Sequence, residues 1–150
     1  MIHSTFTIER RYAAPPDKVY SAFADAAKKR RWFVEGDHHD VEYHDLDFRV
    51  GGKETARFRF KEGTPVAGLA CLTDTWYLEL SPNQRVVMAQ TMTLNGGCIS
   101  AALVTIELEA VDGEKLLTCT HQGAFFEGAD GPQMREMGWQ VLLGKLSAEF

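Results

Sequence analysis

The sequence lacks the features that mark several common protein classes. Its 150 residues include only 3 cysteines, Cys71, Cys98 and Cys119, which lie far apart and form no C-x-x-C pair. This pattern predicts reduced thiols, with neither a disulfide framework nor a zinc site. No stretch approaches the roughly 18 apolar residues of a membrane-spanning helix, and the first residues show no signal-peptide pattern. We therefore expect a cytoplasmic protein that does not insert into membranes.

The sequence also lacks an excess of positive charge, since its 16 lysines and arginines are outnumbered by 21 acidic residues. The formal net charge is -5 and the isoelectric point is near 5.5, which argues against a general nucleic-acid surface. The basic run Lys28–Arg31 is the exception. We interpret it as the solvated face of a short helix, with a phosphate or partner site as the alternative. The glycine clusters at 51–52 and 96–97 do not lead into a helix with a Lys-Ser/Thr pair, so we expect no phosphate loop and no cofactor.

The C-terminal segment Pro132–Phe150 is predicted to form one long helix, since proline is favoured at the first helical position. One apolar stripe at helical spacing comprises Trp139, Leu142, Leu143, Leu146 and Phe150. A second apolar arc comprises Met134, Met137, Val141 and Ala148. Two arcs predict a helix that is covered on more than one side. Gly138 and Gly144 each cost roughly 1 kcal/mol relative to alanine, which indicates close approach of another backbone.

The rest of the chain alternates with the period of β-strands. Thr5–Tyr12 reads as a half-buried strand, and two short helices follow it, the second ending at Trp32-Phe33. The sequence Asp112-Gly113 is a strong hairpin signal. Further strands are expected at 41–48, 53–61, 68–80, 85–94, 99–110 and 116–123, and a glycine-rich loop at 123–131.

Consecutive strands joined by tight turns favour an antiparallel meander. Each strand has one apolar face, and the C-terminal helix is the one element long enough to cover it. The sequence therefore predicts a single α+β domain over residues 1–150. In this helix-grip arrangement, a curved antiparallel sheet of six to seven strands wraps around the long C-terminal helix, with a cavity near the start of that helix.

Several segments, in this order and spacing, carry a family resemblance. They are Phe6–Tyr20, Arg31-Trp32-Phe33, Asp47–Lys53, Leu117–Gly123, and Met137-Gly138-Trp139 with Leu146. The chain resembles the activator of heat-shock protein 90 ATPase homologue-like family of the START-like/SRPBCC helix-grip superfamily, which also includes polyketide cyclases and birch-pollen-allergen-like proteins. The resemblance implies a small domain with an apolar cavity and a structural Gly51-Gly52 pair. It does not imply one activity, because one fold hosts many.

Two polar clusters are candidates for chemistry. The segment His38–His44 contains metal-ligand residue types, but its spacing matches no defined motif, so we interpret it as a polar surface strand and predict no metal. His121 is in phase with Leu117 and Cys119, on the face expected to point inward. An inward histidine can serve as an acid or base, or it can be a structural histidine at the edge of the core. No nucleophilic triad is supported.

The aromatic and methionine residues are the stronger signal. Pockets for apolar ligands are lined in this way, and simple core filling is the alternative. We expect the ligand-binding set to comprise Trp32, Phe33, Phe58, Phe60, Trp76, Met88, His121 and Trp139. Met92 shares their inward phase, and His121 or Arg57 would provide a polar anchor.

The leading hypothesis is a non-catalytic protein that binds a small hydrophobic or aromatic ligand as a monomer or homodimer. One alternative is a cyclase or aromatase that uses His121 as acid or base. The other is a chaperone-linked or stress-response interaction module that uses Lys28–Arg31 or the loop containing Phe125 and Phe126.

Overall fold

The computed structural model describes all 150 residues and contains one antiparallel sheet of seven strands. Their order across the sheet is β1-β7-β6-β5-β4-β3-β2. The strands are β1 (Ile2–Tyr12), β2 (His39–Leu46), β3 (Lys53–Phe60), β4 (Ala70–Ser81), β5 (Arg85–Leu94), β6 (Gly97–Val111) and β7 (Glu114–Phe125). The helices are α1 (Pro16–Ala24), α2 (Ala26–Lys29), the π-helical turn η1 (Arg30–Val34), α3 (Pro132–Leu146) and the 3-10 turn η2 (Ser147–Glu149).

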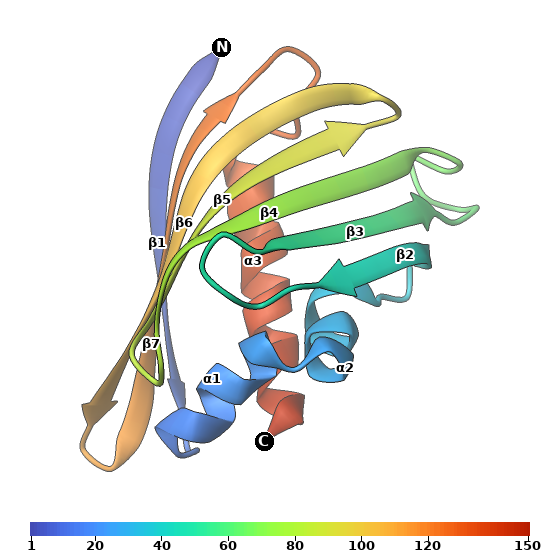
Figure 1. Ribbon diagram of the computed structural model, residues 1–150. Helices are drawn as coiled ribbons and strands as arrows, with labels where there is room; N and C mark the ends of the chain where they lie inside the picture. The colour runs from blue at the N-terminus through green and yellow to red at the C-terminus, as the bar shows by residue number, and fades with distance from the viewer.

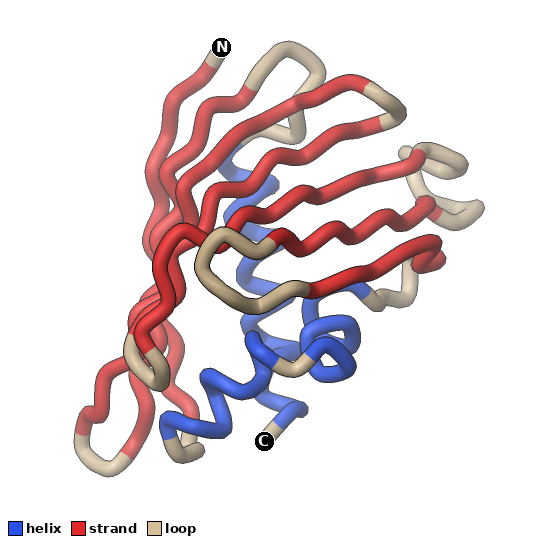
Figure 2. The backbone as a smooth tube through the Cα atoms, in the orientation of Figure 1, coloured by secondary structure: helices blue, strands red, loops and turns tan.

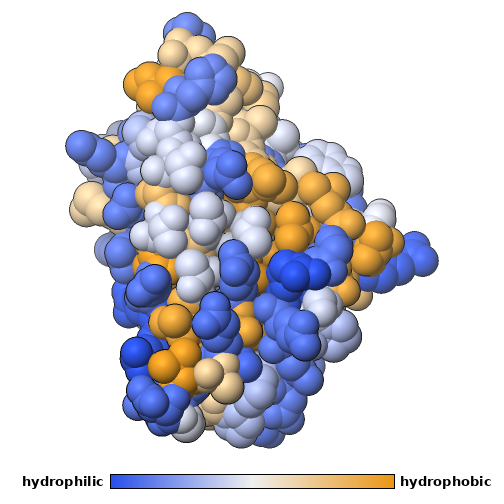
Figure 3. Space-filling view, turned by 90° about the vertical axis from the view of Figure 1, so that its left-hand side faces the viewer, coloured by the Kyte–Doolittle hydropathy of each residue, from blue (hydrophilic) through white to orange (hydrophobic).

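The sheet bends around α3, and the short helices lie at the lower end of the same concave side (Figure 1). All helical segments lie on this one side of the strands (Figure 2). The helix-grip class is therefore confirmed. Because only the concave face is covered, strands with one apolar side suit this sheet. The side of the molecule that is on the left in Figure 1 is largely hydrophilic or intermediate in character, with some apolar patches (Figure 3).

Local sequence signals locate most element ends. Asp112 and Gly113 have φ angles of 51° and 79°, the left-handed values that a tight two-residue hairpin requires. The helix α3 begins at Pro132, as predicted, but ends at Leu146 before the short turn η2. The strand β7 runs to Phe125, two residues into the predicted loop, because its pairing with β1 continues to that point.

The core lies between the sheet and one face of α3. Trp139, Leu143 and Leu146 are buried and Leu142 packs against the core, which confirms these four members of the first apolar stripe. Its last predicted member, Phe150, lies beyond the end of α3 and is exposed. Three hydrogen bonds attach α3 to β1. The Tyr12 hydroxyl donates to the Leu143 carbonyl at 2.7 Å, and Arg10 Nη2 donates to both the carbonyl and the Oε1 of Gln140 at 3.0 Å. These bonds hold the helix along the β1 side of the sheet.

The second apolar arc of α3 is not covered, and this prediction was wrong. Met134, Met137 and Val141 are each about two-thirds exposed. The glycines do not mark a close backbone either. A Cβ on Gly138 would meet no atom within 4 Å, and one on Gly144 would meet only the tip of Arg10. Only one face of α3 therefore contacts the sheet.

Trp76 lies on the opposite face of β4 from the one predicted. The buried residues of this strand are Cys71, Thr73, Thr75 and Tyr77. Trp76 points outward beside the Lys53 ammonium, which lies 5.1 Å from the ring centroid. A β-bulge between Tyr77 and Glu79 changes the alternation, so the apolar residues before and after it face different sides.

No helix in the structure has both the length and the apolar character needed to cross a bilayer.

Candidate functional site

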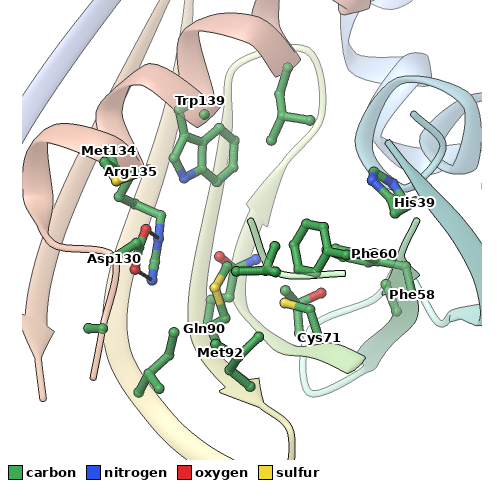
Figure 4. Close-up of a pocket in the computed structure, with 18 of the residues that line it drawn as sticks. His39, Phe58, Phe60, Cys71, Gln90, Met92, Asp130, Met134, Arg135 and Trp139 are labelled. Atoms are coloured by element: carbon green, nitrogen blue, oxygen red, sulfur yellow. Dashed lines mark hydrogen bonds and ion pairs between the residues drawn. The ribbon is translucent and has the colours of Figure 1, made fainter. Parts of the chain in front are cut away.

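A cavity of about 550 Å³ lies between α3 and the middle of the sheet. Its wall combines β3, β4 and β5, the start of α3, and the loop before α3 (Figure 4). Of the 20 residues that line it, 13 are hydrophobic. Its volume is within the roughly 300–1,000 Å³ typical of small-molecule sites. The site is therefore large enough and apolar enough to enclose a small organic molecule.

Four members of the predicted aromatic set line this cavity: Phe33, Phe58, Phe60 and Trp139. Strand alternation places Phe58 and Phe60 on the concave face, and α3 brings Trp139 over them. Phe58 and Phe60 meet edge to face with ring centroids 5.6 Å apart. Met92, which shared the predicted inward phase, also lies in the wall.

The other four members of the set are elsewhere. Trp32 and Met88 are buried in the core beside the cavity and do not line it. The indole nitrogen of Trp32 donates to the Ala22 carbonyl at 2.7 Å. Trp76 is on the outer face, and His121 lies inside the sheet–helix core, outside the cavity wall. Strand phase placed Met88 and His121 correctly on the concave face, but it did not show where along that face the space remains.

His121 occupies a closed apolar layer. Its ring stacks on Phe6 with centroids 4.7 Å apart and planes 7° apart, and the centroid of the Phe125 ring lies 5.9 Å from that of the imidazole. The residue has no exposed surface, and neither ring nitrogen has a hydrogen-bond partner. Burial and the nearby Arg135 cation lower the pKa of His121 from 6.5 to about 4. The ring is therefore neutral near pH 7 and has no contact with the cavity.

Gly123 makes room for this ring. It is two residues after His121 and on the same face of β7, and a Cβ there would lie 2.8 Å from His121 Cε1. Such a distance is shorter than normal carbon contacts, so any larger residue would displace the imidazole. The glycine in the resembling segment Leu117–Gly123 thus has a packing role.

A few polar side chains interrupt the apolar wall. Gln90 Nε2 donates to Thr75 Oγ1 at 3.0 Å. Arg135 makes two hydrogen bonds with the Asp130 carboxylate, both 2.8 Å long, and its Nη2 also donates to Ser100 Oγ at 2.9 Å. Gln90, Asp130 and Arg135 all line the cavity.

Sequence reasoning missed these residues, although a signal was present. Gln90 follows Val86 and Met88 in the inward phase of β5, so it is a polar residue on an otherwise apolar face. Arg135 is one helical turn before Trp139 on the buried stripe of α3. A single polar residue at an inward position of an otherwise apolar strand or helix face is typical of ligand-binding pockets, which are mostly apolar with a few polar groups.

Cys71, a residue type that can act as a nucleophile, lies in the cavity wall. Burial raises the pKa of its thiol to about 12, so the residue is a protonated thiol at neutral pH. The thiolate is the reactive form of cysteine. Cys71 therefore contributes an apolar surface to the wall.

A buried ionic cluster lies behind the Phe33 end of the cavity. Lys29 Nζ donates to Glu54 Oε1 at 2.7 Å, the Tyr77 hydroxyl donates to the same oxygen at 2.7 Å, and His44 Nε2 donates to Glu54 Oε2 at 2.8 Å. Lys29 Nζ also lies 4.3 Å from the centroid of the Phe33 ring. Burial alone would raise the pKa of Glu54, but Lys29 and the three hydrogen bonds outweigh it and lower this pKa to about 2.

This cluster corrects two predictions. The basic run is not wholly solvated, because Lys29 is only 2 % exposed. Lys28, Arg30 and Arg31 do reach the surface, where Arg31 pairs with Glu149 at 2.6 Å. The segment His38–His44 is also not simply a surface strand, since the His44 side chain is buried against Glu54.

Three further residues complete the comparison with the predicted sites. His39 lies in the cavity wall with its ring centroid 4.3 Å from that of Phe58. Arg57 projects to the outer face and pairs with Glu42 at 2.9 Å, so it does not anchor a ligand in the cavity. Phe125 is buried and not part of an exposed loop. No three His, Cys, Asp or Glu side chains converge into a metal-binding group.

Comparison with known proteins agrees with this architecture. The family model described as "Activator of Hsp90 ATPase homolog 1-like protein" matches residues 13–150. The chain belongs to this family. The crystal structure of the Mll3558 protein from Rhizobium loti is 44% identical over 99% of this chain and 98% of its own, with a TM-score of 0.87. A protein from Rhizobium leguminosarum is 31% identical over 99% of this chain and 94% of its own, with a TM-score of 0.90. No curated protein matches the chain.

Proposed function

We propose that this member of the Activator of Hsp90 ATPase homolog 1-like family binds one small apolar or aromatic molecule in the cavity beside Trp139 and releases it unchanged. The observation that carries the proposal is the cavity of about 550 Å³ with its largely hydrophobic wall. Enclosing an apolar molecule there removes its surface from water, which stabilises the complex by roughly 25 cal/mol per Å² of buried apolar surface.

The chemistry of the wall supports binding over catalysis. A general acid or base must lie within hydrogen-bond reach of its substrate, and His121 is closed off beside Phe6 and Phe125. The thiol of Cys71 is protonated. The Arg135 guanidinium pairs with the Asp130 carboxylate through its Nε and Nη2 atoms. The polar groups of the wall are therefore better suited to hold and orient a ligand than to attack one.

Gly138 offers a direct test, because it lines the cavity and leaves open space where a side chain would begin. A phenylalanine at this position should narrow the cavity without an initial clash. Met137 is adjacent on α3 but is exposed and outside the wall. Gly138→Phe and Met137→Phe therefore make a matched pair.

Binding of the fluorescent apolar probe phenylnaphthylamine should be measured for both variants and the natural chain. We expect a bound complex with the natural chain, a loss of affinity of at least tenfold in Gly138→Phe, and no change in Met137→Phe. Mass spectrometry of the extracted probe should find it unmodified. Equal affinity in all three proteins, or no binding to the natural chain, would overturn the proposal.

A further inference from the structure

The polar side chains of the cavity form a band across the wall. On the sheet, Gln90 pairs with Thr75 of β4 on one side and with Ala102 of β6 on the other. Ser100 is two residues before Ala102 on β6 and holds Arg135 Nη2. Gln90 and Ser100 are thus diagonal neighbours on adjacent strands, whose residues are about 7–8 Å apart. The band brings Gln90 and the Arg135 guanidinium to the same part of the cavity.

Each of these two groups has hydrogen-bonding capacity to spare. Gln90 uses Nε2 on Thr75, while its Oε1 accepts no hydrogen bond from the chain. Arg135 uses Nε and Nη2 on Asp130 and Ser100, while its Nη1 donates to no atom of the chain. Both residues are about 5 % exposed, and both lie beneath Trp139 at the cavity wall (Figure 4). Only the His121 nitrogens are fully buried without a partner, so Gln90 Oε1 and Arg135 Nη1 remain accessible from the cavity. An occupant that covers these two atoms is favoured if it pairs with them, because buried polar groups are normally paired.

The charges in this polar band determine which polar group a ligand can place against it. Asp130 and Arg135 are the ionised pair of the wall, and their bidentate contact cancels the positive charge locally. A ligand carboxylate would lose its hydration and find the guanidinium already engaged, which is unfavourable. A hydroxyl both donates and accepts, so it can accept from Nη1 and donate to Oε1.

We infer that the cavity selects an uncharged amphipathic ligand, with an apolar ring body and one hydroxyl group that accepts from Arg135 Nη1 and donates to Gln90 Oε1. This inference rests on the proposed function, since it specifies the chemistry of the molecule bound at the same site. The apolar body lies against Trp139 and Phe58, and the oxygen faces the polar band.

Three probes that share the pyrene ring system test this inference: pyrene, hydroxypyrene and pyrene carboxylate. Near neutral pH the phenolic hydroxyl is protonated and the carboxylate is ionised. Dissociation constants from fluorescence titration should be lowest for hydroxypyrene, by about tenfold relative to each of the other two. Equal affinities, or tightest binding of the carboxylate, would overturn the inference while leaving the proposed function intact. Failure of all three probes to bind would overturn both.

Two variants, Gln90→Leu and Asp130→Asn, test whether these residues produce the ligand selectivity, and Gln122→Leu is the control. Gln90→Leu should weaken hydroxypyrene about three- to tenfold and leave pyrene unchanged, whereas Gln122→Leu on the exposed face should change neither. Asp130→Asn removes the cancelling negative charge, so pyrene carboxylate should gain about tenfold or more relative to hydroxypyrene. Circular dichroism verifies that each variant is folded. Unchanged selectivity in folded Gln90→Leu and Asp130→Asn proteins would contradict the assigned contacts.

Discussion

The closed environment of His121 predicts a specific loss of stability in mild acid. The ring is neutral in the folded chain, where its pKa is about 4, and has a pKa of 6.5 when unfolded. As the pH falls below 6.5, the unfolded chain takes up a proton that the folded chain does not. The stabilisation is therefore complete above pH 6.5 and is lost progressively until the pH reaches 4.

The size of this loss of stability follows from the difference between the pKa of His121 in the folded chain and in the unfolded chain. One pKa unit corresponds to about 1.4 kcal/mol, so the full shift amounts to about 3 kcal/mol of unfolding free energy. Glu54 has a folded pKa of about 2 and an ordinary value of 4.5, so its contribution is lost only as the pH falls below 4.5. The interval from 6.5 to 4.5 therefore isolates His121 from Glu54, and its share there is about 2–3 kcal/mol.

The perturbation is His121→Phe, which keeps an aromatic ring beside Phe6 and Phe125 and removes the titrating group. Urea unfolding should be measured at about pH 7 and about pH 4.5 for both proteins. The natural chain should lose about 2–3 kcal/mol more than the variant between these two conditions. Any packing cost of the larger ring near Gly123 is independent of pH and cancels in this comparison.

The reasoning is refuted if both proteins lose equal stability over that interval. An NMR titration of the His121 ring gives an independent readout. A midpoint at or above the ordinary value of 6.5 would show that the ring is hydrated or paired, contrary to its position in the core.

Two further predictions concern Lys29 and Gly138. Lys29→Met leaves the Glu54 carboxylate buried without its cation and should lower the unfolding free energy by about 3–5 kcal/mol, whereas Lys29→Met with Glu54→Gln should recover much of this loss. Urea unfolding measures both, and a double variant no more stable than the single one would contradict the pairing. Gly138→Ala should raise the free energy of unfolding by up to about 1 kcal/mol, because its Cβ meets no atom. A lowered melting temperature in a calorimetric scan would show that the glycine is required by the backbone.

The order of the elements along the chain and the helical grip were predictable because they depend on local patterns, whereas the pairing of β1 with β7 joins distant parts of the chain and was not predicted. The alternation around Phe6 and Ile8 gives β1 its buried face, and Pro132 begins α3. The cavity aromatics Phe58 and Phe60 were also within reach, since a regular strand of period two fixes which side each residue faces. Such information is contained within a few neighbouring residues.

Trp76 shows where local patterns fail. Its side of β4 carries large apolar residues, but the bulge after Tyr77 and the position of Gln90 on β5 place threonines on the concave face. A one-residue change in alternation reverses every side chain that follows. Sequence alone does not mark the bulge.

The sequence by itself determined the element order, the antiparallel meander, the buried stripe of α3 and the family. Only the tertiary structure decided that Lys29 is buried, because its partner Glu54 is 25 residues away on another element. It likewise placed Arg135 against Ser100 and kept His121 out of the cavity. The physical reason is that periodicity reports which side of an element is apolar, whereas the location of a cavity depends on how distant elements pack and on the space that their side chains leave unfilled.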